Sequence, residues 1–153
     1  MNRLTHFIDR LEEHSLVHHK VNHQISNSSV GWHIEHSLKV ITGIVDALEK
    51  SNKNDYKWKF NLGRYFILFI NQIPRGKGEA PKIVVPEGEI THESLKSSIE
   101  RTRLAVKKIQ KLQPNNFFTH PYFGDLNLRI AKRFLNIHTN HHLKIISDIN
   151  KKA

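Results

Sequence analysis

Three histidines lie close together near the C-terminal end of the chain, in the segment IHTNHHLKII at residues 137–146. Histidine is a common ligand of divalent transition metals and also serves as a general acid or base near neutral pH. His138 and His142 are four residues apart. On a helix, side chains with this spacing lie on one face, so the two imidazoles can reach a common metal ion.

Hydrophobic periodicity predicts that this pair faces the core. The expected inward stripe has the spacing 4-3-4-3-4 and comprises Ala131, Leu135, His138, His142, Ile145 and Ile149. A buried neutral imidazole needs both a donor and an acceptor. The other residues of this stripe are aliphatic and supply neither, whereas one shared cation would satisfy both imidazoles. His141 can join an adjoining apolar stripe, so periodicity does not choose between His141 and His142.

The third ligand is expected from another helix, because the pair alone is weak evidence. Twelve histidines in 153 residues give roughly one such spacing by chance. Segment 30–48, VGWHIEHSLKVITGIVDAL, is apolar on two sides of its predicted helix. His36 aligns there with apolar and small residues and is the best candidate. His33 is the alternative, although its neighbours Ser37 and Lys39 suggest exposure.

The elements that must position these histidines are helical. Apolar periodicity, capping residues and proline stops predict helices over about 2–20, 30–48, 62–73, 91–112 and 127–150. The expected caps are Asn27, Ser28 or Ser29 for the second helix, Thr91 for the fourth and Asn127 for the last. With no strand pattern recognised, the chain is predicted to be an all-α bundle, in a single domain spanning residues 1–153.

One segment departs from the helical pattern. Residues 74–90 hold three of the five prolines and three of the seven glycines, which predicts a long irregular loop. The run KIVV between two of these prolines is compatible with an extended strand. Loops of this length in compact domains are often functional, and both a lid over a site and a surface insertion fit the sequence.

Composition excludes several classes of function. The absence of cysteine excludes disulfides, thiolate metal sites and a cysteine nucleophile. The longest apolar run, residues 65–70, is too short to span a bilayer, and no signal peptide is recognised. We therefore expect a cytoplasmic protein without a membrane partner. The formal net charge is +10, but the basic residues are scattered and only KWKF (57–60) alternates them with aromatics, which argues against a nucleic-acid partner.

The order WHIEH, HPYFG and HTNHHL resembles the DinB/YfiT-like family of metal-binding helical proteins over nearly the whole chain. The resemblance implies a four-helix bundle with a long crossover loop. Carried over residue by residue, it implies a metal site of His36, a few residues after Trp32, with His138 and His142. It places His141 outside the ligand set. Members often form homodimers, bind nickel or zinc, and include thiol-dependent S-transferases.

Three neutral imidazoles would leave a metal ion with an open position, which is the arrangement of catalytic sites. The resulting hypothesis is a divalent-metal-dependent enzyme that acts on an unidentified small molecule as a thiol S-transferase, with an external low-molecular-weight thiol, or as a hydrolase. No general base is recognised, since Glu35 points about a third of a turn away from His36. The alternatives are a non-catalytic metal-binding or stress-associated interaction domain and, with less support, a basic nucleic-acid-binding helical domain.

Overall fold

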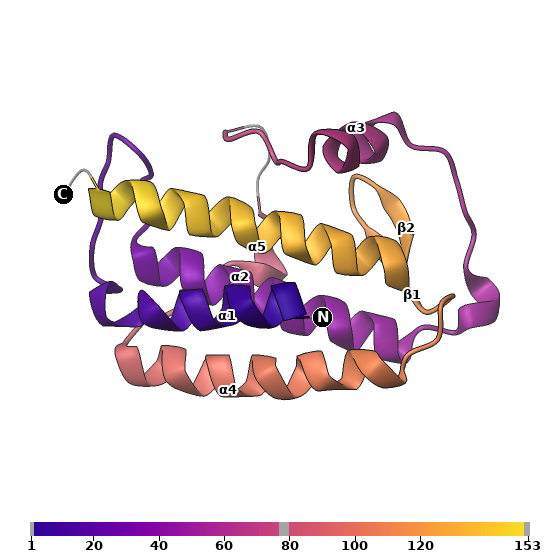
Figure 1. The fold of residues 1–153 in the computed structure, drawn as a ribbon, viewed down its shortest axis with the longest axis horizontal. Coiled ribbons are helices and arrows are strands. Elements are labelled where there is room, and N and C mark those ends of the chain that lie inside the picture. Colours follow the sequence, from indigo (N-terminus) through magenta and orange to yellow (C-terminus); the bar gives the residue numbers. More distant parts are fainter. Residues whose placement is uncertain (1, 77–79, 152–153) are drawn as a thin grey trace.

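Four long helices lie side by side in the computed structural model, which describes residues 2–76 and 80–151 (Figure 1). They are α1 (Asn2–Glu13), α2 (Val30–Lys50), α4 (His92–Lys108) and α5 (Leu128–Lys151). α1 and α2 each pack against both α4 and α5. Their buried faces are mainly aliphatic. This arrangement confirms the predicted all-α four-helix bundle.

The helix ends follow the predicted caps. The side chains of Ser29, Thr91 and Asn127 accept hydrogen bonds from backbone amides at the starts of α2, α4 and α5. Each cap satisfies an amide that would otherwise lack a partner in the first helical turn. α1 is shorter than predicted and is followed by a separate 3-10 helix at Ser15–Val17. Further 3-10 turns lie at Lys53–Asp55, Lys82–Val84 and Ile109–Lys111.

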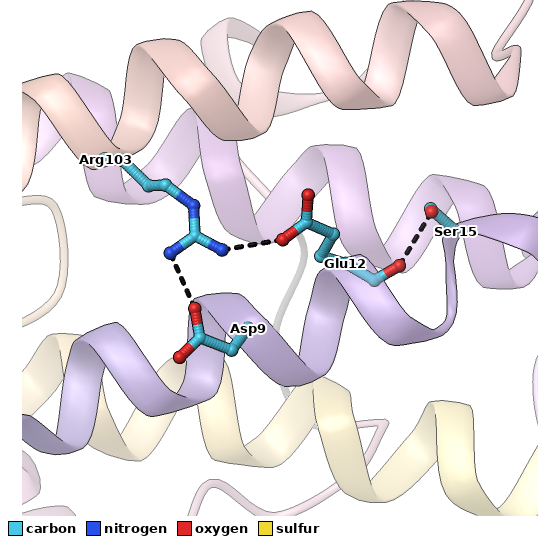
Figure 2. Close-up of polar contacts among 4 residues, drawn as sticks. All are labelled: Asp9, Glu12, Ser15 and Arg103. Carbon is cyan, nitrogen blue, oxygen red and sulfur yellow. Dashed lines mark hydrogen bonds and ion pairs between the residues drawn. The ribbon is translucent and has the colours of Figure 1, made fainter.

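Arg103 joins α4 to α1 at the bundle surface (Figure 2). Its guanidinium contacts Asp9 at 2.6 Å and Glu12 at 2.7 Å. The two carboxylates lie three residues apart on α1, so a single arginine reaches both. Half-exposed ion pairs contribute little stability, but this fork fixes the alignment of the two helices.

A short hairpin precedes α5, and here the sequence prediction was wrong because it recognised no strands. β1 (Phe117–His120) pairs antiparallel with β2 (Gly124–Asn127). Phe118 pairs with Leu126 and both side chains are buried, whereas Thr119 pairs with Asp125 on the outer side. Each strand has only four residues, too few for alternation to be recognised in the sequence.

The connection from α2 to α4 crosses the bundle and contains α3 (Leu62–Ile70). α3 ends at Asn71, which adopts a left-handed conformation with φ of 53°. Within the predicted loop 74–90, residues 77–79 lie outside the described residues. The KIVV run does not form a strand in the structure: Lys82–Val84 is a 3-10 turn. No described helix is both long and apolar enough to cross a membrane.

Candidate metal site

α2 brings two histidines to the interface with α5. His33 and His36 are one turn apart, and only 4% and 3% of their surfaces are exposed. The expectation that His33 is exposed was wrong. It rested on polar neighbours, but Ser37 is itself buried because its hydroxyl donates to the His33 carbonyl at 2.8 Å. A serine that bonds its own helix backbone can lie inside a core.

α5 supplies the other two site histidines along the predicted inward stripe. His142 is buried and His138 is largely covered, while the remaining members of the stripe are buried aliphatic residues. His141 turns towards residues 71–75 and lines a cavity of about 230 Å³ with them. His141 is not among the three histidines whose candidate ligand atoms converge, although its ring lies 5.1 Å from that of His142.

His36, His138 and His142 bring their candidate ligand atoms within 4.8 Å of one another. The ring centroids lie 4.6–5.2 Å apart. In a tetrahedral site with bonds of about 2.1 Å, ligand nitrogens are separated by about 3.4 Å. Small side-chain rotations would close the difference, so these three imidazoles could hold a metal ion.

Hydrogen bonds to the ring nitrogens determine which atoms remain available. His36 Nδ1 lies 2.9 Å from the Val84 carbonyl oxygen. Because a carbonyl only accepts, Nδ1–H donates and the Nε2 lone pair is left for the cluster. The ring of His36 is also stacked on Trp32, with centroids 4.9 Å apart and planes inclined by 11°. Outer contacts of this kind orient metal-binding histidines.

His142 is held by a second histidine. His142 Nδ1 and His33 Nδ1 are 3.0 Å apart, and His33 Nε2 is 3.0 Å from Ser26 Oγ. If His142 donates from Nδ1, its Nε2 carries the lone pair needed for metal binding, and His33 donates onward to Ser26. The opposite proton arrangement would place a hydrogen on His142 Nε2, so metal binding requires the first.

His138 provides an independent test of whether a metal fits. Its Nδ1 is buried and has no hydrogen-bond partner among the described residues. Buried polar atoms are rarely left unpaired in native proteins. An imidazole with one unsatisfied nitrogen, beside two others whose Nε2 atoms can be free, is a donor set that suits a divalent cation.

The electrostatic environment keeps the imidazoles neutral. Burial, followed by neighbouring histidines, lowers the pKa of His138 and His142 well below 6.5. Burial also lowers the pKa of His33 to about 4, and that of His36 despite the opposing effect of the Val84 carbonyl. Neutral imidazole is the form that binds metals, so no proton has to be displaced at neutral pH.

Part of the predicted loop covers this site. Two successive carbonyls, those of Val84 and Val85, accept hydrogen bonds from His36 and from Lys39 Nζ at 2.9 and 3.0 Å. The segment around Val84 therefore lies directly on α2 beside the cluster. This backbone contact to a candidate ligand could not be recognised in the sequence, and the lid interpretation of the loop stays a prediction.

Glu35 lies on another side of α2, as its helical position predicts. Its Oε1 accepts a hydrogen bond from Ser98 Oγ of α4 at 3.1 Å. Glu35 and Lys39 line a cavity of about 490 Å³ between α2, α4 and residues 87–90. That cavity is not formed by the clustered histidines, so its volume says nothing about a substrate at the candidate metal site.

Sequence reasoning misjudged His33, which it weighed as a ligand but expected to be exposed, and it assigned no role to His120. The position of His33 one turn before His36 is the signal that it could face the same interface. His120, on β1, stacks on Phe123 and contacts Phe134, whose ring lies 5.8 Å from that of His138. No local pattern reveals His120, because the hairpin had to be recognised first.

The fold and site together define a helical bundle with a cluster of three imidazoles between two of its helices. The sequence model of the DinB superfamily matches residues 2–146. The chain therefore belongs to the DinB superfamily. Searches of curated proteins and of solved structures gave no match.

Proposed function

We propose that the chain is a divalent-metal-dependent enzyme acting on a small molecule, with the ion held by His36, His138 and His142. The convergence of three candidate ligand atoms within 4.8 Å is the observation that carries the proposal. Nickel and zinc are the favoured ions, because neutral imidazoles suit both and the chain has no thiolate to offer.

When bound, such an ion would act as a Lewis acid and would favour ionisation of a coordinated water or thiol. The chain's own groups would position the ligands: the Val84 carbonyl holds His36, and His33 holds His142. A thiol S-transferase or a hydrolase fits this chemistry. Because the chain has no cysteine, a thiol nucleophile would be an external low-molecular-weight thiol.

A non-catalytic metal-binding domain is the second candidate. The charged groups that shift the pKa values of His33, His36, His138 and His142 are other histidines, Lys39 and Arg75, with no carboxylate among them. Glu35 faces α4 instead. A catalytic reaction would therefore need its base from the substrate, from bound hydroxide or from a histidine.

Metal analysis of protein purified without an affinity tag tests the site. Stoichiometric nickel or zinc, and a raised unfolding temperature when either is added to metal-free protein, are expected. The absence of both would refute the metal site. A panel of thiols and electrophiles, and of hydrolase substrates, then separates the two candidates: turnover that is lost in His142→Ala supports an enzyme, and binding without turnover supports the non-catalytic domain.

Three other features stay predictions alongside this proposal. The resemblance favours a homodimer, which sedimentation would test. A single domain over residues 1–153 predicts one cooperative unfolding transition. A cytoplasmic location would be tested by cell fractionation.

A further inference from the structure

α3 exposes an apolar face although its other side, with Ile67, Leu68 and Ile70, is partly buried. Leu62, Tyr65, Phe66 and Phe69 have the spacing of one helical face, and all four are exposed, with 87% of Phe69 accessible. Arg64 of the same helix is buried. A surface helix normally turns its apolar face inward, so this face requires an explanation.

The exposed surface extends beyond the helix. Trp58 and Phe60 precede α3, and Phe60 stacks on Tyr65 with centroids 5.3 Å apart. The Asn61 side chain donates to the Tyr122 carbonyl at 2.9 Å, which ties the hairpin turn to the start of α3. The α3 face, as we define it, comprises seven exposed side chains: Trp58, Phe60, Leu62, Tyr65, Phe66, Phe69 and Tyr122.

Arg64 fixes this orientation. Its guanidinium donates to the carbonyls of Asp125 at 3.2 Å and Phe123 at 3.4 Å, and also to that of Lys59. Rotating α3 to bury its apolar face would expose these carbonyls and break all three bonds. Losing hydrogen bonds to a buried charged group is costly, so the chain itself holds the α3 face outward.

The charge around the α3 face is mainly positive, with exposed Asp55 just before the segment and Asp125 beside Arg64. Residues 56–76 contain four basic side chains and no acidic one. Arg64 is buried and Arg75 pairs with Asp148 at 2.7 Å, whereas Lys57 and Lys59 are exposed beside the aromatic side chains. Arg133 of α5 donates to the Leu68 carbonyl, which adds a further exposed cationic side chain beside α3.

We propose that the α3 face docks on an anionic lipid surface. Its aromatic and leucine side chains would enter the boundary between headgroups and acyl chains, and Lys57, Lys59 and Arg133 would contact acidic headgroups. Aromatic residues beside lysine and arginine are typical of membrane interfaces. The expectation of no membrane partner rested on the lack of an apolar run long enough to span a bilayer. A peripheral contact does not require such a run. The proposal does not depend on the metal site.

Two other occupants fit the charges and side chains less well. In a two-fold dimer through this face, two predominantly basic surfaces would meet, which is repulsive. A single-stranded nucleic acid would stack its bases on free aromatic rings, and two of the six rings of this face, Phe60 and Tyr65, are already stacked on each other. The experiment below would also detect dimerisation or nucleic-acid binding through this face.

Co-sedimentation with vesicles of phosphatidylcholine and phosphatidylserine tests the proposal. The full chain is expected to bind these vesicles, and to bind pure phosphatidylcholine vesicles at least about tenfold more weakly. Phe66→Ser with Phe69→Ser should reduce binding at least about tenfold, since both apolar side chains leave the interface. Leu104→Ser is the matched control, because Leu104 is exposed on α4, across the bundle from α3.

The electrostatic arm uses Lys57→Glu with Lys59→Glu, which should also weaken binding at least about tenfold, whereas Lys107→Glu with Lys111→Glu on the α4 side should not. Circular dichroism verifies that each variant folds. Failure of the wild type to bind anionic vesicles, or equal binding by the double serine variant, would overturn the proposal. Dimerisation or oligonucleotide binding lost in the serine variant, with no vesicle binding, would assign the face to that partner instead.

Discussion

The interface between α2 and α5 and the outer face of α3 reverse the usual distribution of side chains in opposite directions. The first region encloses four polar imidazoles, three of them buried and one largely covered, and the second exposes seven large apolar side chains. Both departures are costly unless a partner compensates them, since buried polar groups need hydrogen bonds and exposed apolar groups remain in contact with water.

The difference between the regions lies in where that partner is found. Four of the eight ring nitrogens of these histidines are matched within the chain, by the Val84 carbonyl, by Ser26 and by the pairing of His33 with His142. One buried nitrogen, His138 Nδ1, is not. The α3 face has no such internal match. A small cation would therefore complete the first region, while the second needs an extended surface.

Removing one ligand should produce the largest effect. His142→Ala is expected to weaken zinc binding roughly 100-fold, since affinities of about 10–16 kcal/mol for four-ligand structural zinc sites correspond to about 2.5–4 kcal/mol per ligand. Competition with a chromogenic chelator measures it. His141→Ala is the matched control on the next residue and should retain wild-type affinity. Equal losses of zinc affinity in the two variants would show that His142 is not preferred over His141 as a ligand.

Removing the support of a ligand should have a smaller effect. His33→Ala leaves all three candidate ligands in place but removes the partner of His142 Nδ1. Loss of such an outer contact is expected to lower metal affinity 10- to 100-fold. His33→Gln, which retains a hydrogen-bonding side chain, should recover part of the affinity in the same titration. Wild-type affinity in His33→Ala would show that His142 is oriented by packing alone.

The pH dependence of stability should sharpen the contrast further. Burial lowers the pKa of His120 from 6.5 to about 4, so the unfolded chain takes up this proton first. The contribution of His120 is therefore present above pH 6.5 and is lost as the pH falls towards 4. In metal-free protein, urea denaturation gives the loss of unfolding free energy between pH 7 and pH 5.5. We expect this loss to be smaller by about 1 kcal/mol in His120→Phe than in the wild type.

The matching measurement on the other region is Phe69→Ser, which should keep the wild-type pH dependence because it removes no titratable group. A His120→Phe profile that superimposes on the wild type would mean that His120 does not stay neutral in the folded protein.

The smallest effect is expected for the stability of the α3 face. Phe69→Ser should change the free energy of unfolding by less than about 0.5 kcal/mol, because the side chain is already in water. Leu11→Ala, at a fully buried position of α1, should cost about 2–5 kcal/mol. Urea denaturation compares the two directly. A large cost for Phe69→Ser would show that this residue packs within the chain in solution.

Local patterns in the sequence were sufficient for the bundle and for two of its histidines. The caps at Ser29, Thr91 and Asn127 and the stripe through His138 and His142 are properties of residues within a few turns of one another. Such patterns depend on the 3.6-residue period of the helix, which the sequence displays directly. The hairpin was missed because each strand offers only four residues of alternation.

Contacts between distant segments were decided only by the tertiary structure. His33 meets His142 across 109 positions of the chain and His36 meets Val84 across 48, and no period within either segment encodes these contacts. The orientation of α3 could not be predicted either, because its apolar residues have the same spacing as those of a helix that faces the core. Three hydrogen bonds from the buried Arg64 hold that face outward, and their acceptors lie in the hairpin and just before α3. The sequence determined which faces the helices possess, and long-range hydrogen bonds decided what each face meets.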